Sequence, residues 1–253
     1  MKKVNLLSIN ISTGSYNNFV QEIINRAKSH ESRYACLANV HMLIEAYRAP
    51  EFAHIIKNAS IVTPDGKPLS WALWLLQGIR QERVAGMDLL PDLLQEAAAE
   101  QLPVYFYGGK PEMLAKAEDQ MKRRFPGLQV SGYYSPPFRT LTSEEDDAVV
   151  AEINASGAGL VFVVLGCPKQ ERWMAKMQGR IHAVMVGVGG ALPVLLGDQK
   201  RAPDWMQHAG LEWAYRLAQE PRRLFERYAV TNTTFLYLLI RSYILMKFFK
   251  KAA

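Results

Sequence analysis

The chain has 253 residues, of which 49% are hydrophobic and 21% are charged; this composition excludes a globally disordered protein and suits one large domain or a domain with an appendage. Its two cysteines, Cys36 and Cys167, exclude a disulfide framework and lack zinc-site spacing, and the N-terminus lacks a signal peptide's apolar core, so we expect a cytoplasmic protein. The net charge of +6 indicates an anionic partner, such as nucleic acid, a lipid surface or a phosphorylated substrate.

Strand and helix patterns alternate along most of the chain. Apolar runs predict strands at residues 34–39, 59–62, 103–107, 130–134, 160–165 and 183–186. Apolar spacing and helix-start signals predict helices at residues 41–47, 69–76, 89–99 and 111–125, and another that begins at residue 143. Repeated β-α alternation is typical of a mainly parallel sheet with helices on both faces, so we expect a Rossmann-like α/β fold.

The turn at residues 62–68 directly follows the second of these strands. Pro64, Gly66 and Pro68 force the chain to turn there, and Asp65 places a carboxylate on that turn. Open α/β folds bind their ligands at the carboxyl ends of the strands. Asp65 is therefore a candidate general base, although an Asx-turn or a cap on the following helix would also explain an aspartate here.

Glycines follow two further strands. Gly108 and Gly109, and later Gly187 and Gly189, would allow a diphosphate to approach the backbone closely, although tight turns alone also explain them. The later cluster does not match the dinucleotide fingerprint, because Leu192 occupies the third glycine position. This argues against a nicotinamide or flavin cofactor and against an epimerase or dehydrogenase.

A polar segment at residues 166–173 follows the strand at 160–165. Gln170 is able to form bidentate hydrogen bonds with a sugar or a base, and Lys169 is placed to meet a phosphate. A solvated helix start is the alternative interpretation.

The last part of the chain mixes basic and apolar residues. The apolar stretch at 235–249 is shorter than the roughly 20 residues that a spanning helix needs, and Arg241 interrupts it. Because so much bulky apolar surface is unusual in a nucleic-acid arm, we expect a membrane surface as the partner and an interfacial helix as the contact. A helix packed against the body or against a dimer partner is the alternative, and the oligomeric state stays open.

Short motifs in a fixed order carry a family resemblance. They lie at residues 39–41, 64–66, 83–88, 166–171, 187–190, 201–203, 211–213 and 220–223. Each motif is weak alone, but the ordered set closely resembles the WecG/TagA/CpsF family, glycosyltransferase family 26, across residues 32–228.

The resemblance implies an inverting transferase without a metal or other cofactor. It would move a sugar from a UDP-sugar to a polyprenyl-diphosphate-linked sugar at the inner face of the membrane, in the synthesis of cell-surface polysaccharide or teichoic-acid linkage units. It also implies a catalytic core at residues 1–200 and a helical appendage at residues 201–253 that closes over the site.

The same resemblance assigns roles to individual residues. Asp65 would be the base, and Arg83 would stabilise the diphosphate leaving group, since no Asp-x-Asp element suggests a metal. The residues expected to bind substrate are Asn39, Gly66, Asp88, Gly108, Gly109, Gly166, Pro168, Lys169, Gln170, Gly187, Gly189, Arg216, Arg222 and Arg223.

Two positions need separate interpretation. Leu37 stands where relatives often carry a threonine, so no hydroxyl is available there. His41 lies in a helical apolar pattern, and we expect a helix-start or core histidine instead of a base. A non-catalytic UDP-sugar-binding or membrane-scaffolding subunit is the alternative function; Leu37 favours it, and the retained Asp65 and Gln170 argue against it. The sequence does not identify the sugar.

Overall fold

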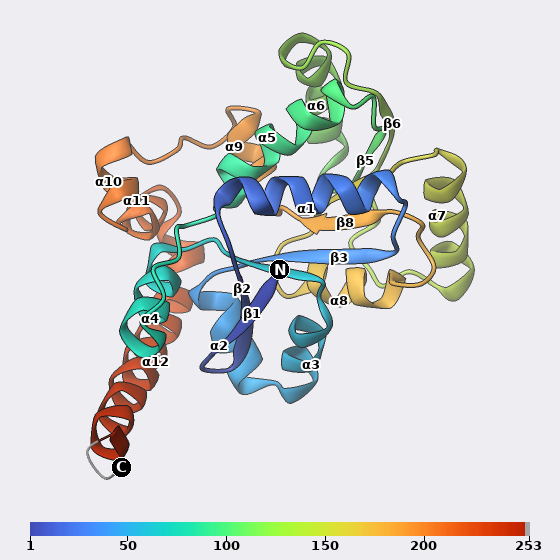
Figure 1. The fold of residues 1–253 in the computed structure, drawn as a ribbon. Coiled ribbons are helices and arrows are strands. Elements are labelled where there is room, and N and C mark those ends of the chain that lie inside the picture. The colour runs from blue at the N-terminus through green and yellow to red at the C-terminus, as the bar shows by residue number, and fades with distance from the viewer. Residues whose placement is uncertain (251–253) are drawn as a thin grey trace.

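A six-stranded parallel sheet forms the centre of the protein in a computed structural model that describes residues 1–250 (Figure 1). The strands lie in the order β4-β3-β8-β7-β5-β6, and every neighbouring pair is parallel. Their bounds are β3 (Arg33–Ala38), β4 (Ile61–Pro64), β5 (Val104–Gly108), β6 (Val130–Tyr134), β7 (Leu160–Val164) and β8 (Val184–Gly187). The predicted parallel α/β fold is confirmed.

Helices cover both faces of this sheet and enclose two hydrophobic cores (Figure 1). One face carries α1 (Tyr16–Lys28), α5 (Gly86–Ala99) and α6 (Pro111–Arg124), and the other carries α2 (Val40–Arg48), α3 (Pro50–Asn58), α7 (Ser143–Ala155) and α8 (Lys169–Met177). Side chains alternate between the faces along each strand, so Phe106 enters the first core and Tyr105 and Tyr107 enter the second. Because both faces are covered, the strands are nearly continuously apolar.

Parallel strands bring their carboxyl ends to one edge of the sheet, and the predicted site residues follow those ends. Asn39 comes directly after β3, Asp65 after β4, Gly109 after β5 and Gly189 shortly after β8. Asn39 also caps α2, because its Oδ1 accepts a hydrogen bond from the Met42 backbone N–H at 3.2 Å. The fold therefore gathers segments that are far apart in the sequence.

The N-terminal elements were not predicted. An antiparallel hairpin of β1 (Lys2–Leu6) and β2 (Ile9–Thr13) precedes α1. It packs beside the central sheet, where the Ser12 hydroxyl accepts a hydrogen bond from the Val62 backbone N–H at 3.1 Å. Both strands are short and mix polar with apolar residues, so their pattern alone is weak.

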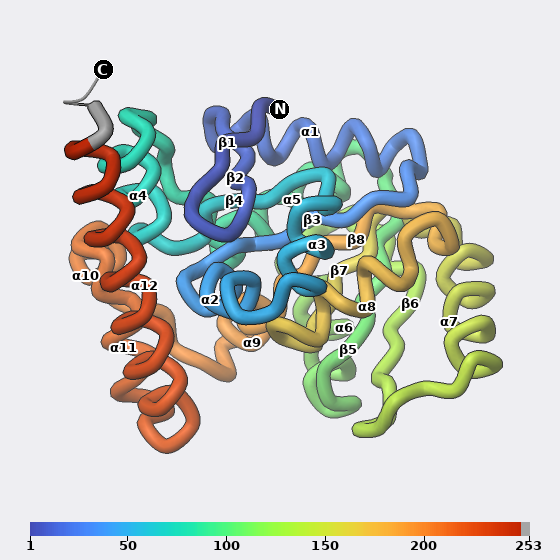
Figure 2. Tube along the Cα trace, turned by 90° about the horizontal axis from the view of Figure 1, so that it is seen from below, coloured from blue at the N-terminus to red at the C-terminus, as the bar shows by residue number. Residues whose placement is uncertain are grey.

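The C-terminal segment is largely helical in its described part. After α9 (Ala191–Leu195), it forms α10 (Asp204–His208), α11 (Glu212–Gln219) and α12 (Pro221–Lys250), and the boundary expected at residue 200 falls between α9 and α10. Helix α12 begins well before the apolar stretch at 235–249 and runs beside α2 and α4 (Lys67–Gln77), as Figure 2 shows. None of the helices in residues 1–250 combines the length and apolar character needed to cross a membrane.

Helix α12 has one packed face and one open face. Leu224, Thr231, Phe235 and Leu238 are buried against the body, whereas most large apolar side chains elsewhere on the helix are exposed. The alternative of a helix packed on the body thus holds for one face only. Residues 251–253 of the expected appendage lie outside the described part of the chain.

Candidate active site

A cleft of about 1340 Å³ opens at the carboxyl edge of the sheet, between the core and helices α11 and α12. Its size suits a nucleotide-sugar together with part of a second substrate. The predicted residues that line it are Asn39, Asp65, Gly66, Arg83, Gly109, Gly166, Lys169, Gln170, Gly187, Gly189, Arg216 and Arg223.

Four predicted residues do not line the cleft. Gly108 has a φ of 102°, and a Cβ there would lie 2.7 Å from the Val164 carbonyl oxygen. A glycine is therefore needed at this position for β5 to pack beside β7. Asp88 faces two arginines, Pro168 forms the N-terminal cap position of α8, and Arg222 is exposed on α12. None of the four borders the cleft in this arrangement of the chain, and their contact with substrate stays a prediction.

Asp65 occupies a rigid turn between β4 and α4. Its backbone N–H donates to the Ala38 carbonyl at 2.8 Å, which ties the turn to the end of β3. Its side chain does not cap α4, where Gly66 is the N-cap without a side-chain bond. Instead, Oδ1 accepts a hydrogen bond from the Gly86 backbone N–H at 2.9 Å, at the start of α5. The carboxylate is thus fixed by the protein and faces the cleft.

The surroundings of Asp65 make its carboxyl group a base suited to neutral pH. The pKa of Asp65 is raised from 3.8 to about 6, chiefly by burial and also by the nearby Glu212 carboxylate. The Gly86 hydrogen bond and the positive charges of Arg83 and Arg216 oppose that rise. A carboxylate with this pKa is ionised at pH 7 and accepts a proton readily.

Arg83 is held by carboxylates from two parts of the chain. Its Nη1 pairs with Glu212 on α11, and its Nη2 lies 3.2 Å from Asp88 on α5. Asp88 in turn pairs with Arg201 at 2.5 Å. Two of these three ion pairs join the core to residues beyond 200. Arg83 lies in the site as expected, but the two carboxylates already balance its positive charge. Its pair with Glu212 fixes the C-terminal helices over the cleft.

Arg216 is the arginine best placed to meet an incoming anion. Within residues 1–250 it forms no ion pair or side-chain hydrogen bond, and it borders the cleft beside the end of β8. A Cβ at Gly190 would lie 2.8 Å from its Nη2, so the glycine permits this approach. Arg223 also borders the cleft, although it pairs with Glu220 one turn earlier.

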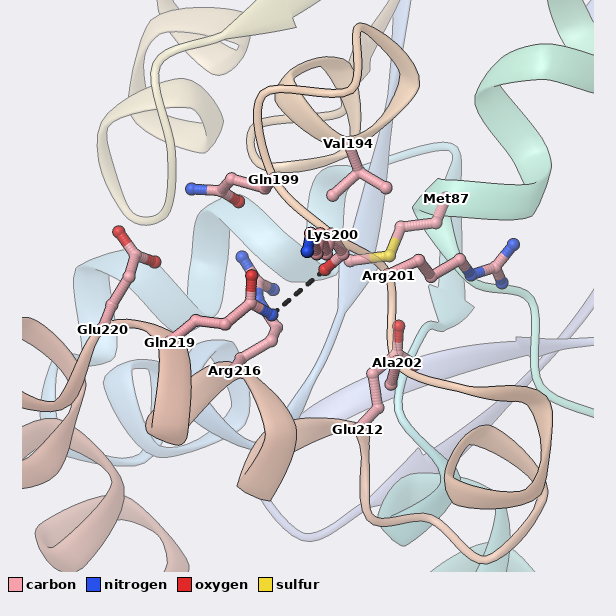
Figure 3. Close-up of a pocket in the computed structure, with 10 residues that line it drawn as sticks. All are labelled: Met87, Val194, Gln199, Lys200, Arg201, Ala202, Glu212, Arg216, Gln219 and Glu220. Carbon is pink, nitrogen blue, oxygen red and sulfur yellow. Dashed lines mark hydrogen bonds between the residues drawn. The ribbon is translucent and has the colours of Figure 1, made fainter.

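A second, much smaller cavity lies on the other side of Arg216. Figure 3 shows it between α11 and the preceding loop, where Gln219 donates a hydrogen bond to the Lys200 carbonyl at 3.1 Å. Its volume of about 20 Å³ holds about one water molecule and no substrate.

The Gln170 side chain lines the cleft and is hydrogen-bonded within the protein. Its Nε2 donates to Glu171 at 2.8 Å and to the Gly187 carbonyl at 3.1 Å, and its Oε1 accepts from the Gly166 N–H at 3.1 Å. Both amide hydrogens are therefore used inside the protein, which excludes bidentate contact with a sugar or base in this arrangement. Gln170 instead holds the turns after β7 and β8 together at the floor of the cleft.

Among the cleft residues that the sequence did not assign to the site are Arg227 and His41. Arg227 lies one helical turn beyond Arg223, and this spacing could have identified it. Burial and the neighbouring arginines lower its pKa, so an anion beside it would be stabilising. His41 lies in the first turn of α2, as expected, and on the cleft wall; burial and Arg227 lower its pKa and keep the imidazole neutral.

Comparison with known proteins identifies the family of this chain. Residues 4–248 match the sequence model of the family described as Glycosyl transferase WecG/TagA/CpsF family. One relative, from Bacillus spizizenii, is named N-acetylglucosaminyldiphosphoundecaprenol N-acetyl-beta-D-mannosaminyltransferase. It is 33% identical over 195 residues, which cover 77% of this chain and 74% of the relative. The match extends beyond both ends of the segment in which the motifs were found, and the chain belongs to the WecG/TagA/CpsF family of glycosyltransferases.

Proposed function

We propose that this glycosyltransferase moves a sugar from a UDP-sugar to a polyprenyl-diphosphate-linked sugar with inversion, and that Asp65 is its base. The acceptor hydroxyl gives its proton to the Asp65 carboxylate as its oxygen attacks the anomeric carbon. The bond between that carbon and the diphosphate oxygen breaks, and UDP leaves with the electron pair. The observation that carries the proposal is the fixed Asp65 carboxylate in the large cleft, with a pKa of about 6.

The arginines beside the cleft fit the charge that develops on UDP. Arg216 has no carboxylate partner among the described residues, and Arg227 would be stabilised by an adjacent anion. Guanidinium groups bind phosphate oxygens in a bidentate manner and act strongly in a site shielded from water. We therefore assign stabilisation of the leaving group chiefly to Arg216, Arg223 and Arg227, and propose that the reaction proceeds without a metal ion.

The relative's name guides the choice of substrates. That protein is named for a diphosphoundecaprenol-linked N-acetylglucosamine and for transfer of N-acetylmannosamine. We propose an acceptor of the same chemical class here, held in the membrane by its prenyl chain. We further propose that the protein associates with the inner face of the cell membrane through the appendage of residues 201–253, because the exposed apolar face of α12 is long and flanked by basic residues.

A panel of UDP-sugars with a short-chain prenyl-diphosphate-linked N-acetylglucosamine tests this function. UDP release is followed with and without EDTA, and omission of the acceptor is the control. We expect one donor to give acceptor-dependent release that survives EDTA, with the opposite anomeric configuration in the product. Retention of configuration would contradict Asp65 as a base, and abolition by EDTA would contradict the proposed role of the arginines.

A further inference from the structure

Helix α4 has an apolar face that its packing covers only in part, where the Trp71 ring lies against Gly210. Trp71 and Trp74 are 50% and 55% exposed, and Leu75 is also exposed, whereas Leu73 on the other side is fully buried. The spacing of one helical face, i, i+4, i+7 and i+8, is that of Lys67, Trp71, Trp74 and Leu75. Large apolar side chains grouped in this way mark an interaction site.

Helix α12 runs beside α4 and has a similar face. Figures 1 and 2 both show the two helices side by side, and they are in contact. The exposed large side chains in the second half of α12 are Leu236, Tyr237, Ile240, Ile244, Leu245 and Phe248. We call these residues, together with Trp71, Trp74 and Leu75, the α4–α12 surface.

The two helical segments themselves carry charge of a single sign. Residues 66–81 and 227–248 contain no aspartate or glutamate, and neither do residues 1–21 of the neighbouring hairpin segment. The exposed charges on the two helical segments include Arg80, Arg241 and Lys247. Tryptophan at the edge of an apolar face with cations beside it is typical of contact with an anionic membrane. A second copy of the chain fits less well, because a symmetric contact would bring like charges together.

We propose that the α4–α12 surface binds an anionic bilayer, with α4 as a second membrane contact besides the C-terminal helix. Helix α4 starts at Lys67, which lines the cleft, immediately after the Asp65 turn. Four residues of helix advance about 6 Å along the axis, so Trp71 lies only one turn beyond the cleft end of α4. Contact through α4 holds the base close to the lipid surface where a prenyl-linked acceptor would lie. This second membrane contact adds to the proposed function, and it rests on that function only for the identity of the acceptor.

Sedimentation with phosphatidylglycerol and phosphatidylcholine vesicles tests the surface without any turnover. We expect the full chain to bind phosphatidylglycerol vesicles preferentially, and Trp74→Ala to weaken that binding about tenfold through lost apolar burial. Trp74→Phe should bind within about twofold of the wild type. Trp205→Ala is the matched control, because Trp205 is an exposed tryptophan on α10 beside Asp204, and it should bind like the wild type.

The outcomes separate this inference from the proposed function. Unchanged binding of a folded Trp74→Ala protein would overturn the α4 contact, and absence of wild-type binding, or equal binding to neutral vesicles, would overturn the whole surface. If Trp74→Ala does not fold, quenching by brominated phosphatidylglycerol decides: Trp74→Phe should show less quenching than the wild type, and equal quenching would refute the contact. Turnover of a water-soluble short-chain acceptor without vesicles reports the proposed function alone.

Discussion

The backbone N–H of Gly86 donates a 2.9 Å hydrogen bond to Oδ1 of Asp65, which joins the end of β4 to the start of α5. The helix N-terminus stabilises the carboxylate, while burial disfavours its charge more strongly and sets the pKa at about 6. Asp65 lines the cleft, and among the described residues its side chain accepts this hydrogen bond through Oδ1 alone. This contact fixes the position of the proposed base, and burial acting against it sets the basicity.

The pH dependence of activity should report the Asp65 carboxyl group. Because its pKa is raised to about 6, the group is protonated below that pH and cannot accept the acceptor's proton. We expect kcat/KM to fall about tenfold per pH unit below pH 6 and to level off above pH 7. A plateau that continues down to pH 4.5 would show that a carboxyl group with an ordinary pKa, or none, controls the reaction.

Replacement of Asp65 should stabilise the folded protein at alkaline pH. The unfolded carboxyl group has a pKa near 3.8 and the folded one a pKa near 6, so above pH 6 the folded state carries a charge that its surroundings disfavour. We expect Asp65→Asn to raise the melting temperature at pH 8 and the gain to disappear as the pH falls towards 4. Asp147→Asn, at a well-exposed aspartate on α7, is the control and should show no such pH-dependent gain.

The Arg83–Glu212 pair should contribute to holding the C-terminal helices on the core. Both side chains are largely buried, so Glu212→Gln leaves the Arg83 charge with Asp88 as its remaining carboxylate partner. We expect a loss of about 3 kcal/mol in the free energy of unfolding, measured by denaturant titration. Glu226→Gln, an exposed residue of α12, should change it by less than about 0.5 kcal/mol. Equal effects of the two changes would show that the pair does not stabilise the closed arrangement.

Arg216 and Arg222 form a natural pair of test sites, because only Arg216 borders the cleft. Removal of a group that stabilises transition-state charge typically lowers kcat by about 100-fold or more. We therefore expect Arg216→Ala to lower kcat by about that factor and Arg222→Ala to leave it within about twofold. Steady-state assays with the donor found in the panel measure both variants. A large loss in Arg222→Ala alone would move the leaving-group contact to the exposed side of α12.

The sequence predicts most of the sheet because each central strand is a short apolar run followed by turn residues. It also predicts that Asp65 lies at the ligand-binding edge, since parallel strands end together. The strand order and the ion pairs that span the chain are different: Arg83 and Glu212 are 129 positions apart, and no local pattern joins them. For the same reason the sequence does not show that the Gln170 amide on α8 donates a hydrogen bond to the Gly187 carbonyl at the end of β8.

The C-terminal helix illustrates another limit of sequence analysis. Its apolar residues occur on all sides, so the periodicity cannot separate the face that packs on the body from the face that stays open. The structure separates the two faces, and this decides which experiment isolates membrane contact. A deletion from residue 234 onwards would remove Phe235 and Leu238, which are buried against the body, and would confuse lost membrane contact with lost packing. Single changes on the exposed face avoid this confusion.

The role of Asp65 as the base is tested by comparing Asp65→Asn with the wild type for both UDP binding and turnover in the presence of EDTA. The asparagine side chain keeps an oxygen that accepts the Gly86 hydrogen bond but cannot take up the acceptor's proton. We predict that calorimetry gives UDP affinities within about threefold of each other, while acceptor-dependent UDP release falls by at least about 1000-fold. Undiminished turnover in a folded Asp65→Asn protein would contradict the central claim that Asp65 is the catalytic base.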